Sequence, residues 1–222
     1  MHRPTLIFDL DGTLTDPREG ITRCIRHALE HVGADCPDEA DLERWIGPPL
    51  HQSFSAILGT NGRAGQALEA FRARYADVGL YENRLYEGIA QALAELQRSS
   101  HALLIATSKP ERHAIRIVEH FGLQPFVRAV YGSELSGERA DKTELLTHLM
   151  REEGLAPADA VMIGDREHDI AAARACRMRS VGVTWGFGSE DELRGAGADM
   201  ICFSIGELVA WCRAATVEEL HD

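Results

Sequence analysis

Residues 5–14 read Thr-Leu-Ile-Phe-Asp-Leu-Asp-Gly-Thr-Leu, a short apolar run that leads into two aspartates. A nearly continuous apolar run of this length is typical of a strand buried on both faces of a parallel sheet. Asp9 and Asp11 are two residues apart, so on an extended chain both carboxylates point into the same volume at the strand's carboxyl end. Gly12 allows a sharp turn there, and the exposed amides of such a turn, at Gly12 and Thr13, can bind an anion. The alternative is a turn with two solvated carboxylates.

Five further apolar runs are predicted to be strands, and amphipathic helical patterns separate most of them. The runs are 102–107, 127–131, 160–164, 180–184 and a weaker one at 199–203. The helical patterns, with apolar residues at helical spacing, are Ile89, Leu93 and Leu96; Ile115, Val118 and Phe121; Leu145, Leu146, Leu149 and Met150; and Leu208, Val209 and Cys212. This alternation predicts an α/β fold with a Rossmann-like parallel sheet, whose sites lie at the carboxyl ends of strands.

Residues 16–84 interrupt the alternation, because they contain no convincing strand and several amphipathic helical patterns. An all-helical insertion directly after the first strand is best interpreted as a cap domain over that strand's carboxyl end. We therefore expect an α/β core formed by residues 1–15 and 85–222, and a helical cap domain formed by residues 16–84. Within the cap, Gly47-Pro48-Pro49 is predicted to be a rigid turn that either faces the site or simply connects two helices.

The composition excludes several classes of protein. The chain has 222 residues, 45% hydrophobic and 26% charged residues, which is typical of a globular domain with an insertion. No apolar run is long enough to span a bilayer, and no signal peptide is recognisable, so a cytoplasmic protein is expected. The net charge of -12 argues against nucleic-acid polymers and anionic membranes as partners. Five cysteines without a CxxC motif favour neither disulfides nor a zinc site.

A second pair of carboxylates follows the run 160–164. Asp165 can be explained as the N-cap of the next helix. Asp169, four residues later, would lie on the same helical face, where capping does not require a carboxylate. Together with Asp9 and Asp11 they would form an oxygen-rich cluster that repels itself unless a hard cation is bound. Carboxylate ligands without His or Cys favour Mg²⁺, which commonly bridges to a substrate phosphate.

Lysine is rare in this chain: of 23 basic residues only Lys109 and Lys142 are lysines, and the other 21 are arginines. The segments 108–111 (Ser-Lys-Pro-Glu) and 141–144 (Asp-Lys-Thr-Glu) both have the form of a capping box, so both lysines are predicted in the first turn of a helix. A cation there is unfavourable by about 0.3–1 kcal/mol unless it shares an anion such as phosphate with the helix N–H groups. The alternatives are chance and, for Lys109, a side chain that extends into solvent.

Four segments resemble the motifs of the haloacid dehalogenase superfamily, and within it the phosphoglycolate-phosphatase-like branch with a helical cap. They are Asp9-Leu10-Asp11-Gly12-Thr13-Leu14, Thr107 followed by Ser108, Lys142, and Gly164-Asp165-Arg166-Glu167-His168-Asp169. The resemblance covers essentially the whole chain, and four motifs in the right order are very specific. It departs at Arg166, where many relatives have Ser or Thr; this guanidinium and His168 either reach the substrate or lie in solvent.

The resemblance implies the catalytic roles of four residues. Asp9 would be the nucleophile that attacks phosphorus, a role that suits an ionised carboxylate because it needs no partner to activate it. Asp11 would be the general acid and then the general base. Thr107 would donate its hydroxyl to a phosphoryl oxygen, and Lys142 would neutralise the nucleophile and the phosphate together.

The resemblance also implies a magnesium site and substrate contacts. Asp9 and Asp165 would bind Mg²⁺ through their side chains and Asp11 through its backbone carbonyl, while Asp169 is similar to an outer carboxylate that holds a metal-bound water or Lys142. The expected substrate contacts are Gly12, Thr13, Ser108, Lys109 and Gly47.

The predicted function is Mg²⁺-dependent hydrolysis of a small phosphomonoester through an aspartyl-phosphate, with phosphoglycolate as the first candidate. Nucleoside 5'-monophosphates are the alternative, because a cap of this size can admit a base. Trp45, Phe54 and Tyr81 could stack on that base, although their helical spacing favours core packing. A sugar-phosphate mutase and a non-catalytic regulatory or binding protein on the same fold are further alternatives. The expected partner is a small phosphorylated metabolite, and the chain is expected to be a monomer or a homodimer.

Overall fold

The computed structural model describes residues 3–46, 50–59, 62–134 and 138–216. The chain divides into two compact units, one formed by Met1–Thr15 and Leu85–Asp222 and the other by Asp16–Arg84. Two short strands, β2 (Thr15–Asp16) and β3 (Arg84–Leu85), pair with each other where the chain passes between the units. The predicted turn at Gly47 lies outside the described residues. Among the residues that are described, no helix is long and apolar enough to cross a membrane.

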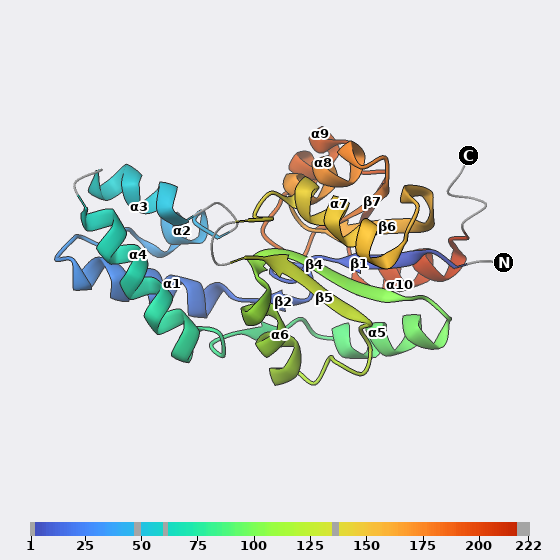
Figure 1. Cartoon of the computed structure of the whole chain (residues 1–222), viewed down its shortest axis with the longest axis horizontal. Helices are drawn as coiled ribbons and strands as arrows, with labels where there is room; N and C mark the ends of the chain where they lie inside the picture. The colour runs from blue at the N-terminus through green and yellow to red at the C-terminus, as the bar shows by residue number, and fades with distance from the viewer. Residues whose placement is uncertain (1–2, 47–49, 60–61, 135–137, 217–222) are drawn as a thin grey trace. The chain divides into compact units, whose positions relative to one another are not determined.

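The first unit is built on a six-stranded parallel sheet, so the predicted α/β fold is confirmed (Figure 1). Its strands are β1 (Thr5–Phe8), β4 (Leu103–Pro110), β5 (Ala129–Ser133), β6 (Ala160–Gly164), β7 (Arg179–Val183) and β8 (Met200–Cys202). They lie in the order β5-β4-β1-β6-β7-β8, with β1 between β4 and β6. This order brings the carboxyl ends of β4, β1 and β6 together at one edge of the sheet.

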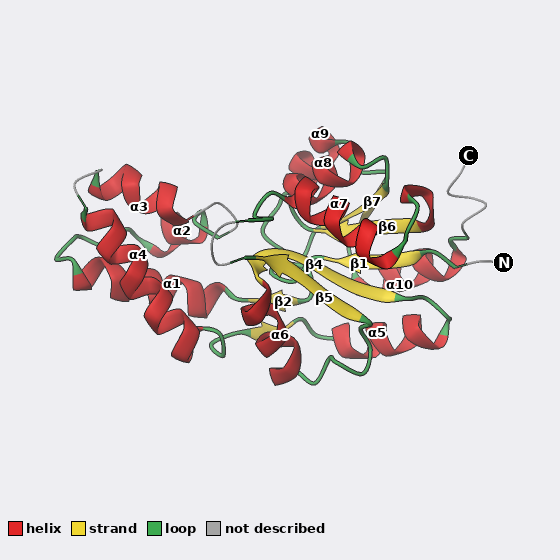
Figure 2. Cartoon of the chain, in the orientation of Figure 1, coloured by secondary structure: helices red, strands yellow, loops and turns green. Residues whose placement is uncertain are grey.

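Helices cover both faces of this sheet (Figure 2). They are α5 (Ile89–Arg98), α6 (Glu111–His120), α7 (Lys142–Glu153), α8 (Glu167–Ala175), α9 (Glu190–Ala196) and α10 (Ile205–Ala214), with a short 3-10 turn, η2, at Pro157–Asp159. On one face α7 and α8 pack on the strands, and their side chains share a core with Ile7, Leu104 and Met162. On the other face α5 packs against α10. In α6 the buried face contains Ala114, Ile117 and Val118, so the prediction is confirmed for Val118, whereas it is wrong for Ile115, which is exposed.

The second unit is helical, as its sequence predicts. It contains α1 (Arg18–His31), α2 (Glu39–Glu43), α3 (Leu50–Leu58), α4 (Arg63–Arg74) and a π-helical turn, η1 (Tyr75–Gly79). Phe54 is fully buried, with its ring centroid 5.3 Å from that of Trp45 and 6.4 Å from that of Phe71. Core packing is thus confirmed for Phe54. It is wrong for Tyr81, which follows the π-helical turn and is exposed.

Candidate active site

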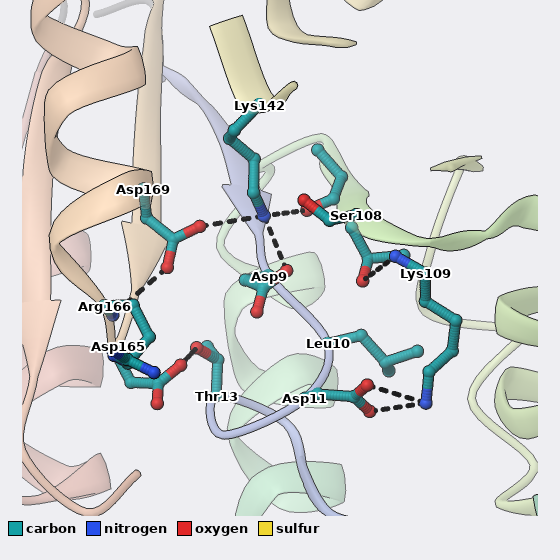
Figure 3. Close-up of polar contacts among 12 residues, drawn as sticks. Asp9, Leu10, Asp11, Thr13, Ser108, Lys109, Lys142, Asp165, Arg166 and Asp169 are labelled. Atoms are coloured by element: carbon teal, nitrogen blue, oxygen red, sulfur yellow. Dashed lines mark hydrogen bonds and ion pairs between the residues drawn. The ribbon is translucent and has the colours of Figure 1, made fainter. Parts of the chain in front are cut away.

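Three buried carboxylates meet where β1 and β6 end. Asp9 follows β1, Asp165 follows β6, and Asp169 lies in the first turn of α8 (Figure 3). Each side chain offers an oxygen within 4.8 Å of the others, and the three residues are 8%, 0% and 2% exposed. The pairing of β1 with β6, Phe8 opposite Ile163, places Asp9 beside the end of β6. We call Asp9, Asp165 and Asp169 the carboxylate site.

Lys142 lies against two members of the carboxylate site. Its Nζ is 2.7 Å from Asp9 Oδ1, 2.8 Å from Asp169 Oδ1 and 3.0 Å from the carbonyl oxygen of Ala106 (Figure 3). An ammonium has three N–H donors, and here it meets three acceptors from different directions. A planar guanidinium does not reproduce that arrangement, so the site requires lysine rather than arginine.

The first turn of α7 places this ammonium. Lys142 is the first residue of α7, as predicted, and the Asp141 side chain caps the helix by accepting hydrogen bonds from Thr143 N and Glu144 N. Capping by a neighbouring residue leaves the Lys142 side chain available to extend along the sheet edge. The helix end is therefore satisfied independently of the site.

Asp165 is not the N-cap of α8, which corrects the structural explanation offered for it. The N-cap is Arg166, whose backbone N–H donates to Asp169 Oδ2 at 3.2 Å. Asp169 therefore connects the helix end to Lys142 through its two oxygens. The Asp165 side chain instead accepts hydrogen bonds from Thr13 Oγ1 at 3.2 Å and from the Phe187 N–H at 2.8 Å.

Lys109 is paired with Asp11, and it does not lie in a helix. Its Nζ is 2.8 Å from Asp11 Oδ1 and 2.6 Å from Asp11 Oδ2, and its side chain is only 7% exposed. The predicted helix start at 108 is wrong because β4 continues to Pro110 and α6 begins at Glu111. Proline disfavours helical backbone in the preceding residue, so Lys109 stays extended. It neither reaches into solvent nor caps a helix.

The end of β4 also carries Thr107 and Ser108. Thr107 is buried, and its Oγ1 accepts a hydrogen bond from the Lys109 N–H at 3.3 Å. Ser108 is exposed, and its carbonyl oxygen accepts a hydrogen bond from Ser133 Oγ at 2.8 Å. Because β4 lies next to β1, both residues occupy the sheet edge that holds Asp9.

The turn after β1 brings the backbone close to the carboxylate site. Gly12 has a φ of +86°, which favours glycine, and a Cβ there would overlap the Asp165 carboxylate. Glycine is therefore required at position 12 for two reasons, its backbone conformation and its lack of a side chain. Arg166, in contrast, forms an ion pair with Glu192 at 2.8 Å, while His168 is exposed.

Burial and repulsion between carboxylates raise the pKa values of Asp9 and Asp165. Burial, with repulsion from Asp169 and Asp11, raises the pKa of Asp9 from 3.8 to about 7, although Lys142 opposes the shift. Burial, together with Asp169 and Asp9, raises the pKa of Asp165 to about 8. Burial disfavours the charged form of Lys142, but Asp169 and Asp9 outweigh it and raise its pKa. The donors are carboxylate oxygens, so their excess negative charge fits a hard divalent cation.

Sequence reasoning missed two glycine-containing segments that border this site. Trp185-Gly186-Phe187-Gly188 follows β7, and the Trp185 indole N–H donates to the Thr13 carbonyl oxygen at 3.0 Å. Gly132, in β5, lies against the backbone of Lys109 and Glu111, where a Cβ would be too close. The available signal was the position of these glycines at strand ends, which marks close approach of backbone.

Comparison with known proteins identifies a family and several relatives that cover most of this chain. Residues 6–183 match the family described as haloacid dehalogenase-like hydrolase. A 5'-nucleotidase from Pseudomonas aeruginosa is 48% identical and covers 94% of this chain and 95% of its own length. The tyrosine-protein kinase PtkA from Mycobacterium tuberculosis is 36% identical over 98% of this chain and 71% of that protein. A phosphoglycolate phosphatase from Mesorhizobium japonicum is 28% identical over 84% of this chain and 85% of that protein.

A solved structure is similar to this chain over almost its full length. The crystal structure of a predicted phosphatase from Clostridium acetobutylicum superposes with a TM-score of 0.88 and is 37% identical in sequence. It covers 95% of this chain and 98% of its own. The likeness therefore includes the helical unit as well as the sheet.

The raised pKa values make the stability of the metal-free protein depend on pH. Asp9 and Asp165 have pKa values of about 7 and about 8 in the folded protein and 3.8 ordinarily, so the folded state binds more protons. The resulting stabilisation is complete below the ordinary pKa and is lost as the pH rises through the folded values. With a chelator present, thermal unfolding should give a lower Tm at about pH 8.5 than at about pH 6. Asp165→Asn should reduce the dependence of Tm on pH. A wild-type Tm that does not change between these pH values would contradict the raised pKa values of Asp9 and Asp165.

Proposed function

The chain belongs to the haloacid dehalogenase-like hydrolase family and is a phosphatase of that family, and we propose that it is a Mg²⁺-dependent 5'-nucleotidase that works through a phosphoryl group carried on Asp9. The observation that carries the substrate class is the 48% identity, over nearly the full length of both chains, to a protein named a 5'-nucleotidase. Phosphoglycolate, the first candidate from the sequence, becomes the second, supported by a relative at 28% identity. The carboxylate site with Lys142, and the neighbouring pair of Asp11 and Lys109, support the chemistry.

In this proposal Asp9 attacks the phosphorus atom. An Asp9 oxygen forms a bond to phosphorus while the bond from phosphorus to the ester oxygen breaks. Lys142 orients the Asp9 carboxylate through Oδ1 and holds it against repulsion from Asp169. Because Lys142 also donates to Ala106, its position is fixed before substrate arrives. Such a preorganised charge stabilises the transition state without moving during the reaction.

Asp11 handles the protons in the proposed cycle. The first step requires Asp11 in its protonated form, which donates its proton to the departing ester oxygen; Asp11 then regains a proton from the water that attacks the phosphoryl group on Asp9. That second attack forms the bond from the water oxygen to phosphorus, breaks the bond from phosphorus to the Asp9 oxygen and releases phosphate. The Asp11 side chain is 20% exposed, so water can reach it, and Lys109 holds it beside the Asp9 turn.

The residues that would hold Mg²⁺ are the side chains of Asp9 and Asp165 and the backbone carbonyl of Asp11. When bound, Mg²⁺ supplies positive charge to the phosphoryl oxygens. In this proposal Asp169 is an outer support, whose two oxygens contact Lys142 and the Arg166 N–H. The absent side chain at Gly12 leaves room for the Asp165 carboxylate. Thr107, Thr13, Ser108 and Lys109 are the proposed phosphate contacts.

The products distinguish hydrolysis from two other reaction types and from binding without catalysis. A mutase would pass the phosphoryl group to a second sugar hydroxyl, and a kinase, the name of one relative, would pass it to a protein. A binding protein on this fold would do neither. Hydrolysis alone yields nucleoside and free phosphate in equal amounts.

The decisive experiment is a phosphate-release screen with Mg²⁺. Purified protein is offered nucleoside 5'-monophosphates, phosphoglycolate and sugar phosphates, and both products are quantified. We expect the highest kcat/KM for a nucleoside 5'-monophosphate, with one nucleoside formed for each phosphate released. Asp9→Asn should abolish release, while the exposed Asp191→Asn should leave it unchanged. Activity that survives Asp9→Asn would refute the covalent mechanism, and a preference for phosphoglycolate would replace the substrate class.

Lys142→Arg tests the role of the ammonium. This change keeps the positive charge but replaces an ammonium, whose three N–H groups reach three acceptors, with a planar guanidinium. Turnover should therefore fall more than about tenfold, which corresponds to a loss of about 1.4 kcal/mol or more of transition-state stabilisation. Thermal unfolding of the variant shows whether the fold is kept. Near-normal turnover in the folded variant would remove Lys142 from the proposed mechanism.

A further inference from the structure

The loop Trp185–Gly188 follows β7 at the same sheet edge as the carboxylate site. Strands β6 and β7 are neighbours, with Gly164 opposite Gly182, so this loop emerges beside Asp165. Two of its N–H groups donate inward: the Trp185 indole to the Thr13 carbonyl at 3.0 Å, and the Phe187 backbone to Asp165 Oδ2 at 2.8 Å. The loop thus touches both the turn after β1 and the carboxylate after β6.

These hydrogen bonds connect three parts of the site: the loop, the turn after β1 and Asp165. Thr13 Oγ1 donates to Asp165 Oδ1 at 3.2 Å, while Phe187 N–H donates to Asp165 Oδ2. Each oxygen of this carboxylate therefore accepts one hydrogen bond, and the two donors come from different segments. The Trp185 indole connects those segments by holding the Thr13 backbone. Rotation of the Asp165 carboxylate would break at least one of these bonds.

Two glycines allow the loop to approach so closely. A Cβ at Gly186 would lie closer than 3.0 Å to both Asp165 Oδ2 and the Gly12 carbonyl oxygen. A Cβ at Gly188 would lie closer than 3.0 Å to the Asp165 carbonyl oxygen. Neither glycine has a positive φ, so their backbone conformation does not require glycine. The space that they leave is occupied by atoms of the site.

We propose that Trp185 and Gly186 are positioning residues that set Asp165 against the Asp9–Thr13 turn for a divalent cation. This inference rests on the proposed Mg²⁺ site. A cation that binds two carboxylates and a backbone carbonyl from separate segments needs those segments held at fixed spacing. Outer contacts of this kind typically contribute about 10- to 100-fold to metal affinity. The Trp185 indole and the backbone at Gly186 hold the segments at that spacing, although neither residue is a proposed metal ligand.

Direct Mg²⁺ binding to the full chain, measured by isothermal titration calorimetry, tests the proposal. Trp185→Phe keeps an aromatic ring but removes the indole N–H, and Gly186→Ala inserts a methyl group against Asp165 and Gly12. Both should weaken Mg²⁺ binding by about tenfold or more. Matched controls are Trp211→Phe, in α10, and Gly195→Ala, in α9, where a Cβ meets nothing within 4 Å. The controls should bind Mg²⁺ like the wild type.

A kinetic readout separates positioning from general damage. At saturating Mg²⁺ the Trp185→Phe variant should recover most of the wild-type kcat with an unchanged KM for substrate, because only the cation's affinity is reduced. Wild-type Mg²⁺ affinity in both variants would overturn the proposal. Equal weakening in the controls would also overturn it. Absence of Mg²⁺ binding by the wild type would instead refute the proposed metal site, and Asp165→Asn identifies that case because it should abolish binding when the site is real.

Discussion

The rest of this structure depends on one electrostatic constraint: three carboxylates are buried together at one sheet edge, and the buried Lys142 ammonium pairs with two of them. Asp9, Asp165 and Asp169 are almost fully removed from solvent, and Lys142 neutralises only part of their charge. Burying a charge without compensation is costly, and like charges at this distance oppose each other. A protein keeps such an arrangement where function requires it. The raised pKa values of Asp9 and Asp165 follow from the same excess of negative charge and from burial.

The topology explains how the chain assembles this cluster from distant segments. Because β1 lies between β4 and β6, residues that follow these three strands converge although they are widely separated in sequence. A different local feature of the sequence shapes the backbone of each segment. Gly12 turns the chain after β1, the pre-proline position keeps Lys109 extended, and capping by Asp141 leaves Lys142 available. The site is therefore built from backbone geometry first and from side-chain chemistry second.

Much of this could be predicted from sequence, and what could not has a common cause. The six strands, the helical insertion and the position of Lys142 in the first turn of α7 follow from local patterns. The Lys109 placement failed because a capping pattern outweighed the effect of Pro110 on its neighbour. The contacts of Trp185 and the close approach of Gly132 are contacts between segments far apart in the chain, which local patterns do not encode. A glycine at a strand end indicates close approach, but not the segment that approaches.

The two lysines in an arginine-rich chain now have separate physical explanations. Each of the two aspartates after β1 is paired with one of them, Asp9 with Lys142 and Asp11 with Lys109. The aspartates are chemically identical, so their surroundings must distinguish them. Asp9 lies among buried carboxylates with a fixed ammonium, whereas Asp11 is more open to water and is held by a side chain from the extended end of β4. A nucleophile benefits from exclusion of water, and a group that exchanges protons with water requires access to it. The proposed division of roles between the two aspartates thus matches the places where their partner lysines are attached.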